Sequence, residues 1–244
     1  MIVLYDGSFE GFLTIVYEYY YAHLRPTTIE KKAPETLILE ELRTIQADDS
    51  KATKVLEALN SKFSKKNFET ILTIFMCDSR AFELDLLSYI ILGFKEPKQL
   101  TNINHPAIFN IHNLQKEYFS LVHRMYGFVR FVELEDGSLY ARVETKFNIL
   151  YSLAQHFSKR LNNQSFIIHD IKRELAFIHS KEFVGIREII GFEEPVVSSD
   201  EEKFSKLWKH FFESVSIESR SNPKLQRQLV PLIYRTYMSE FSLD

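Results

Sequence analysis

The stretch FVRFVELEDGSLYARV, residues 128–143, is the strongest indicator of fold class in this chain. Its two runs, residues 128–134 and 139–143, are rich in β-branched and aromatic residues, which are typical of strands. Glu135-Asp136-Gly137-Ser138 separates the runs, and Asp-Gly supplies the backbone geometry of a tight hairpin turn. We therefore predict a β-hairpin at this place.

Helix and strand patterns continue after this hairpin. Apolar residues at helical spacing predict a helix over residues 148–161, and short apolar runs predict strands over residues 166–169 and 175–179. The patterns do not alternate as they do in parallel α/β folds. We expect the hairpin and the two strands to form an antiparallel sheet flanked by helices.

The first part of the chain is mostly helical by pattern. Residues 2–5 predict a strand that ends at Asp6-Gly7, and Ser8 is a good N-cap for a following helix. Residues 36–46 have the composition of a strand. Further helices are predicted near residues 50–63, 68–76 and 79–92. The predicted class is therefore α+β, mostly helical, with a small N-terminal sheet and an antiparallel sheet in the second half.

Residues 98–105 are the best candidate for a linker, because the apolar periodicity disappears there before Pro106. We predict a mostly helical N-terminal subdomain over residues 1–97 and a C-terminal α+β domain over residues 98–244. Gly127 is expected to end the helix that begins the second domain.

The last long helix is predicted to begin at the acidic cluster of residues 198–202. Phe204, Leu207, Trp208 and Phe211 fall on one face, which we expect to be core, while the lysines fall on the other. Residues 203–235 carry four Lys and three Arg but two Glu, a local excess of five positive charges. Such an excess indicates either a nucleic-acid or acidic-partner surface or a solvated helix face.

Composition excludes several classes of protein. The 244 residues are 45% hydrophobic and 26% charged with a net charge of -3, which is typical of a globular protein. A single cysteine, Cys77, excludes a disulfide framework, a multi-cysteine zinc site and an iron–sulfur cluster held by this chain alone. No phosphate-loop, zinc-protease or hydrolase motif is present, so we expect no metal and no cofactor. We also expect no secretion signal and no membrane span, and a cytoplasmic location.

Histidines and one aspartate are the candidates for acid-base chemistry. They are His123, His156, His169 and Asp170. His169 and Asp170 are adjacent on a predicted strand, so their side chains should point to opposite faces. A hydrogen-bonded turn for this pair and a buried structural role for His156 are the alternatives to catalysis.

Two groups of cations are candidate nucleic-acid contacts. Arg124, Arg130, Arg160, Lys172 and Arg173 make functional sense together only if the fold gathers them on one concave surface. The second group is Arg220, Lys224 and Arg227, beside a short helix predicted to begin at Asn222-Pro223 and to end near Pro231. The alternatives are buried ion pairs for the first group and pairing of Arg220 with Glu218 or Glu240 for the second.

The ordered motifs resemble a family of DNA metabolism or repair proteins that contain a conserved domain of unknown function and are encoded beside a radical-SAM protein. The matching segments are Tyr5-Asp6-Gly7-Ser8-Phe9-Glu10-Gly11-Phe12, His123-Arg124-Met125-Tyr126-Gly127-Phe128-Val129-Arg130-Phe131, His156-Phe157 with Arg160, Ile168-His169-Asp170 with Lys172-Arg173, Leu207-Trp208-Lys209 with Phe211-Phe212, and Asn222-Pro223-Lys224-Leu225-Gln226. They run in order along the whole chain, and their combination is specific.

This resemblance implies a role in DNA repair or modification beside a radical-SAM partner; relatives are also fused to a uracil-DNA glycosylase of the iron–sulfur type. The chain lacks the cysteines of both enzymes, so those activities would reside in partners. Three hypotheses stay open: an accessory protein that binds DNA, with single-stranded DNA as one candidate form; an enzyme that acts on nucleic acid; and a protein-interaction scaffold.

Overall fold

The computed structural model describes residues 1–33, 40–217, 219 and 221–241. The chain divides into two compact units, Met1–Tyr118 and Phe119–Asp244, and the division falls within helix α5, Pro106–Phe128. The predicted linker contains most of the short 3-10 helix η1, Pro97–Thr101, in which Leu100 is buried. A domain boundary after residue 97 stays a prediction.

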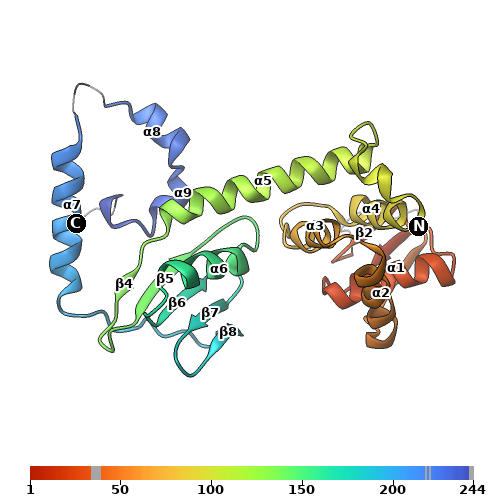
Figure 1. Ribbon diagram of the computed structural model, residues 1–244, viewed down its shortest axis with the longest axis horizontal. Coiled ribbons are helices and arrows are strands. Elements are labelled where there is room, and N and C mark those ends of the chain that lie inside the picture. The colour runs from red at the N-terminus through yellow and green to blue at the C-terminus, as the bar shows by residue number, and fades with distance from the viewer. Residues whose placement is uncertain (34–39, 218, 220, 242–244) are drawn as a thin grey trace. The chain divides into compact units, whose positions relative to one another are not determined.

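The N-terminal unit combines a three-stranded parallel sheet with helices (Figure 1). Strand β1 lies in the middle and pairs with β2 on one side and β3 on the other. The strands are β1 Ile2–Leu4, β2 Thr28–Glu30 and β3 Leu42–Thr44, and the helices are α1 Phe9–Tyr21, α2 Asp49–Lys62, α3 Lys65–Phe75 and α4 Glu83–Lys95. The expected small N-terminal sheet is confirmed, although residues 36–39 of the predicted strand at 36–46 lie outside the described residues.

The start of helix α1 is set by a local signal, as expected. The Ser8 hydroxyl accepts a hydrogen bond from the Gly11 backbone N–H and caps α1. Beyond the cap, Phe12, Ile15 and Val16 are fully buried in a core to which all four helices contribute. Burial of each such side chain contributes about 1.5–3 kcal/mol, so this core holds the helices in place.

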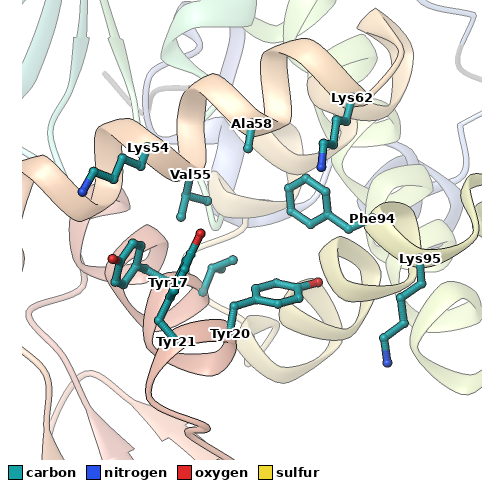
Figure 2. A pocket seen from close by; sticks show the side chains of 10 residues that line it. Tyr17, Tyr20, Tyr21, Lys54, Val55, Ala58, Lys62, Phe94 and Lys95 are labelled. Carbon is teal, nitrogen blue, oxygen red and sulfur yellow. The ribbon is translucent and has the colours of Figure 1, made fainter.

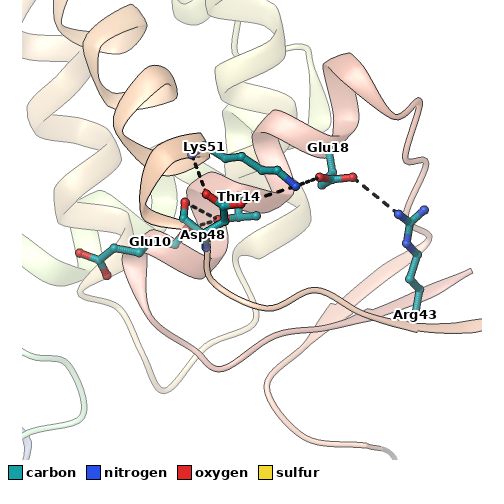
Figure 3. A network of polar contacts seen from close by, with 6 residues as sticks. All are labelled: Glu10, Thr14, Glu18, Arg43, Asp48 and Lys51. Carbon is teal, nitrogen blue, oxygen red and sulfur yellow. Dashed lines mark hydrogen bonds and ion pairs between the residues drawn. The ribbon is translucent and has the colours of Figure 1, made fainter.

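A polar network fastens α1 to α2 and to β3 (Figure 3). The Glu18 carboxylate, on α1, receives the Lys51 ammonium from α2 at 2.7 Å and lies 3.6 Å from the Arg43 guanidinium of β3. The Asp48 backbone N–H donates to the Thr14 hydroxyl, and the Asp48 carboxylate caps α2 at the Lys51 backbone N–H. Helices α1 and α2 are therefore held side by side.

The C-terminal unit is built on a five-stranded sheet in the order β4-β5-β6-β7-β8. Its strands are β4 Val132–Glu133, β5 Leu139–Val143, β6 Phe166–Asp170, β7 Leu175–His179 and β8 Val184–Glu188. The predicted hairpin is confirmed as β4 and β5, and Gly137 adopts φ +78° in its turn. The α+β class is confirmed.

One pair of strands differs from the expected antiparallel arrangement. Strands β5 and β6 are parallel, while the other pairs are antiparallel. Helix α6, Leu150–Arg160, connects β5 to β6, and a crossover of this kind returns the chain to run in the same direction. The sheet is therefore mixed.

Helix α5 ends at Phe128, one residue after Gly127, close to the expected end. A further element differs from the sequence expectation. Strand β8 was not predicted; it lies at an edge of the sheet, and its side chains are largely exposed, so it lacks a strong apolar pattern.

The C-terminal segment contains α7 Glu201–Val215, α8 Pro223–Leu229, α9 Leu232–Arg235 and the 3-10 helix η3 Ser239–Phe241. Asn222 caps α8 by accepting the Leu225 backbone N–H at 3.0 Å, as predicted. The expectation that the apolar face of α7 is core is wrong: Leu207 is 64% and Phe211 54% exposed. The apolar spacing identified an amphipathic helix but not an element that covers it.

Across the ranges described above, no helix is both long enough and apolar enough to span a bilayer.

Candidate nucleic-acid interface

A groove lies between helices α1, α2 and α4 of the N-terminal unit (Figure 2). Its volume is about 480 Å3. Aromatic rings, lysine side chains and small aliphatic groups line it, and we call it the tyrosine–lysine groove. The lining residues are Val16, Tyr17, Tyr20, Tyr21, Lys54, Val55, Ala58, Lys62, Phe94 and Lys95.

The aromatic rings come from both sides of the groove. On α1, Tyr17 and Tyr21 stack one helical turn apart, with ring centroids separated by 4.3 Å. Tyr20 meets Phe94 of α4 edge to face at 5.9 Å. Tyr20 is 37% and Tyr21 72% exposed, so both rings offer accessible aromatic surface.

Glycine at position 93 allows the aromatic side of α4 to form. A Cβ atom at Gly93 would lie 2.3 Å from Cζ of Phe63, far inside van der Waals contact. Without that atom, the Phe63 ring packs on α4 and meets Phe94 at a centroid distance of 5.1 Å. Phe94 is thereby held at the wall of the groove.

Three exposed lysines carry positive charge around these rings. Lys54 and Lys62 lie on α2 and Lys95 on α4. The Lys62 ammonium lies 5.6 Å from the centroid of Phe94, and the Lys54 ammonium 5.9 Å from that of Tyr17. None of the three forms an ion pair with a carboxylate of the described ranges.

This arrangement can bind flat anionic molecules. Burial, with a smaller effect of Tyr19, raises the pKa of Tyr20, so its hydroxyl stays neutral and adds no negative charge to the groove. Ring faces that can stack on a base, beside ammonium groups that can neutralise phosphate, are the combination used for single-stranded nucleic acid. The ionisable side chains of the lining are the tyrosines and lysines named above.

A larger hollow in the C-terminal unit lacks this excess of positive charge. It has a volume of about 720 Å3 and lies beside Trp208 and Arg130. Glu201 is on its wall, and the Arg130 guanidinium lies 2.6 Å from the Glu240 carboxylate. The charge complementarity to phosphate is therefore found in the tyrosine–lysine groove.

Two of the five cations expected on one concave surface are engaged in internal ion pairs. Arg130 pairs with Glu240, and Arg173 donates to the fully buried Asp170 at 2.7 Å. Arg173 also donates to the backbone carbonyls of Thr145 and Lys146. These guanidinium groups form contacts within the C-terminal unit, and their role in nucleic-acid binding stays a prediction.

The other predicted cations are distributed over separate elements. Arg124 lies on α5 near Tyr234. Burial raises the pKa of Tyr234, and the charge of Arg124 opposes this with a smaller effect. Arg160 lies near His156 at the end of α6. Lys172 is exposed between β6 and β7. Lys224 and Arg227 are exposed on α8, which is too short for an N-terminal anion site by itself, and Arg220 lies outside the described residues. A shared surface of these residues stays a prediction.

The four candidate catalytic residues are not gathered at one place. On β6, His169 faces Tyr140 and Phe192 on one side of the sheet, while Asp170 pairs with Arg173 on the other. His156 stacks on Tyr126 with ring centroids 3.9 Å apart. His123 is exposed on α5, and its catalytic role, like that of the others, stays a prediction.

The contact between Tyr140 and His169 has a structural explanation. The Tyr140 hydroxyl lies 2.9 Å from Nδ1 of His169. Burial raises the pKa of Tyr140 to about 12, and burial lowers the pKa of His169. At neutral pH the two groups are uncharged, so the hydroxyl can donate to the imidazole. This bond satisfies two polar groups inside the unit.

The comparisons with known proteins place the chain in a family. The family model for a domain of unknown function, DUF4130, matches residues 80–240, about two thirds of the chain. The chain belongs to the DUF4130 family. No curated protein matches it. The DUF4130 match includes Phe94 and Lys95 of the groove, whereas α1 and α2 precede it.

An ion pair within the DUF4130 match predicts a pH effect. Burial of Glu240 opposes its ionisation, but the hydrogen bonds and charge of Arg130 outweigh this, so its pKa lies below the ordinary 4.5. The pair should therefore hold η3 in place above pH 4.5 and release it as the pH falls through the lowered pKa. Trp208, the single tryptophan, donates to the same carboxylate at 3.2 Å, so its fluorescence should report the change.

The matched variant for this prediction is Glu240→Gln, which cannot form the ion pair at any pH. Its fluorescence should lack the acid transition seen in the wild type. If both proteins showed the same acid transition, a group other than Glu240 would control the release of η3.

Sequence reasoning missed the groove, although signals for it exist. Residues 17–21 include four tyrosines in five positions, which is more aromatic surface than one buried helix face can hold. Lys54, Ala58 and Lys62 are spaced by four, which places two cations and a small residue on one face of a helix. What no local pattern contains is the meeting of these segments with Phe94.

Proposed function

We propose that this chain is a nucleic-acid-binding accessory protein of DNA repair or modification, which uses the tyrosine–lysine groove to hold a nucleic-acid strand. The observation that carries the proposal is the set of three exposed ammonium groups, Lys54, Lys62 and Lys95, around accessible aromatic rings. Phosphate neutralisation by such groups supplies most of the sequence-independent affinity of proteins for nucleic acid.

The lysines of helix α2 differ in whether a carboxylate of the chain pairs with them, and this difference supports binding of an external anion. Lys51, on the same helix, is paired with Glu18 at 2.7 Å and completes the network that fastens α1 to α2. Lys54 and Lys62 have no such carboxylate among the residues described, and their ammonium groups lie near the rings of Tyr17 and Phe94. Their charges are therefore available to phosphate.

The proposed link to DNA repair and the proposed radical-SAM partner both rest on the resemblance of the ordered motifs to the family of DNA metabolism or repair proteins. In this proposal the chain presents a strand, and the radical-SAM partner supplies the chemistry. The tyrosines and lysines of the groove lining support the part of this chain in that division of labour, which is to hold the strand.

The test is the triple variant Lys54→Gln, Lys62→Gln, Lys95→Gln in the full chain. Titration with a labelled single-stranded oligonucleotide should show a loss of affinity of about tenfold or more, because the three phosphate contacts are lost. Each lost contact should also reduce the magnitude of the slope of log affinity against log salt by about 0.7. A fall of about 2 in that slope is expected for three contacts.

The control carries the same change of charge outside the groove lining, at the exposed residues Lys32, Lys66 and Lys98. Replacing these three by Gln should leave most of the affinity in place. Equal losses in both triple variants would mean that net charge, and not this groove, determines binding. Unchanged affinity in the groove variant would refute the proposed function.

A further inference from the structure

We infer that the groove is selective for unpaired bases of a single strand about three to four nucleotides long, an inference that rests on the proposed function. Three features of the groove lead to it: the opening at Ala58, the accessible tyrosine faces and the spacing of the lysines.

The first feature is the space above the tyrosines. Lys54, Ala58 and Lys62 follow one another on the same face of α2, and the small Ala58 side chain leaves the groove open between the two lysines (Figure 2). The volume of about 480 Å3 lies in the range of sites that enclose small organic molecules, so it can accept a base with its sugar.

The second feature is the accessible aromatic surface. The rings of Tyr20 and Tyr21 retain exposed area at the edge of the groove, and Phe94 closes its far side. Stacking on such rings needs the face of a base, which every unpaired nucleotide offers regardless of sequence. Inside a duplex those faces are covered by neighbouring base pairs. The rings therefore discriminate by strandedness and not by sequence.

The third feature is the distance between the cations. Lys54 and Lys62 are eight residues apart on α2, which corresponds to about 12 Å at 1.5 Å per residue. The two ammonium groups lie near different rings, Lys54 near Tyr17 and Lys62 near Phe94, so they can contact different phosphates of one strand. If the bases of the strand stay stacked at about 3.4 Å per nucleotide, the strand covers the distance of about 12 Å in three to four nucleotides. The groove therefore suits a strand segment better than a free nucleotide.

The test fills the groove without changing its charge. Ala58→Leu adds an apolar side chain between the lysines, and Leu is well tolerated in helices. We expect it to weaken binding of oligothymidylate about tenfold and to leave the weaker binding of a duplex of the same length unchanged. Asn60→Leu, at an exposed position of α2 outside the groove lining, is the control and should bind as the wild type does.

A second variant tests the inference even if Ala58→Leu changes the folding of the chain. Tyr21→Leu removes a ring that is 72% exposed and should lower single-strand affinity without lowering stability, which circular dichroism can verify. In the wild type, affinity should rise with oligothymidylate length up to about four nucleotides, and thymidine monophosphate should bind much more weakly.

Several results would overturn the inference. Equal affinity of the wild type for duplex and single strand, or tight binding of thymidine monophosphate, would remove the selectivity for unpaired strands. If polyglutamate bound as tightly as the oligonucleotide, and Tyr21→Leu left its affinity unchanged, the groove would be identified as a site for an acidic protein. Each of these can occur while the triple lysine variant still loses binding, so the inference and the proposed function can fail separately.

Discussion

Replacing Arg173 by Met is expected to lower the free energy of unfolding of the C-terminal unit by about 3–5 kcal/mol. Asp170 is 0% exposed, and the Arg173 guanidinium lies 2.7 Å from its carboxylate. The same guanidinium donates to the carbonyls of Thr145 and Lys146. Without it a buried carboxylate loses its main counter-charge, and the turn after β6 loses its link to the segment after β5. Urea unfolding followed by circular dichroism measures the effect.

Two controls separate this effect from a general loss of charge. Lys172→Met, at the exposed neighbouring position, should change the free energy of unfolding by less than about 0.5 kcal/mol. Replacing both partners, with Asp170→Leu and Arg173→Met, should recover much of the stability, because no buried charge is left. A stable Arg173→Met protein with weakened DNA binding would instead support the role in nucleic-acid contact predicted from the sequence.

Phe12→Ala should destabilise the N-terminal unit by a similar amount, about 3–5 kcal/mol. Phe12 is fully buried on α1, and its ring lies 6.1 Å from that of Phe75 on α3. Phe75 in turn contacts the rings of Phe9 and Phe82. A cavity at Phe12 would weaken the packing that holds α1 against the rest of the core.

Because α1 carries the tyrosines of the groove, loss of nucleic-acid binding should accompany thermal unfolding of this variant and should not precede it. Tyr21→Ala, at an exposed position on the same helix, should leave the melting temperature nearly unchanged while it weakens binding. If Phe12→Ala unfolded at the wild-type temperature, the aromatic packing at this point would contribute far less than burial implies.

Signals that act over a few residues were read correctly from the sequence. Asp136-Gly137 turns the hairpin, Ser8 caps α1 and Asn222 caps α8, as the structure confirms. Each of these depends on one backbone conformation or one hydrogen bond to a residue three positions away, so the sequence contains the whole interaction.

Contacts between distant residues could not be read in the same way. The parallel pairing of β5 with β6 depends on the path of α6, and the apolar face of α7 shows amphipathicity without showing what covers it. Arg130 pairs with Glu240, which lies 110 residues away in the sequence, and Arg173 pairs with Asp170. A charge pattern does not state which charges are neutralised.

By itself, the sequence determined the α+β class, the hairpin, the main helices and the caps of α1 and α8. Only the tertiary structure brought the tyrosines of α1, the lysines of α2 and Phe94 of α4 to one groove. The physical reason is that helix and turn formation are decided by neighbours along the chain, whereas a binding groove is decided by which helix faces pack together once the core is buried.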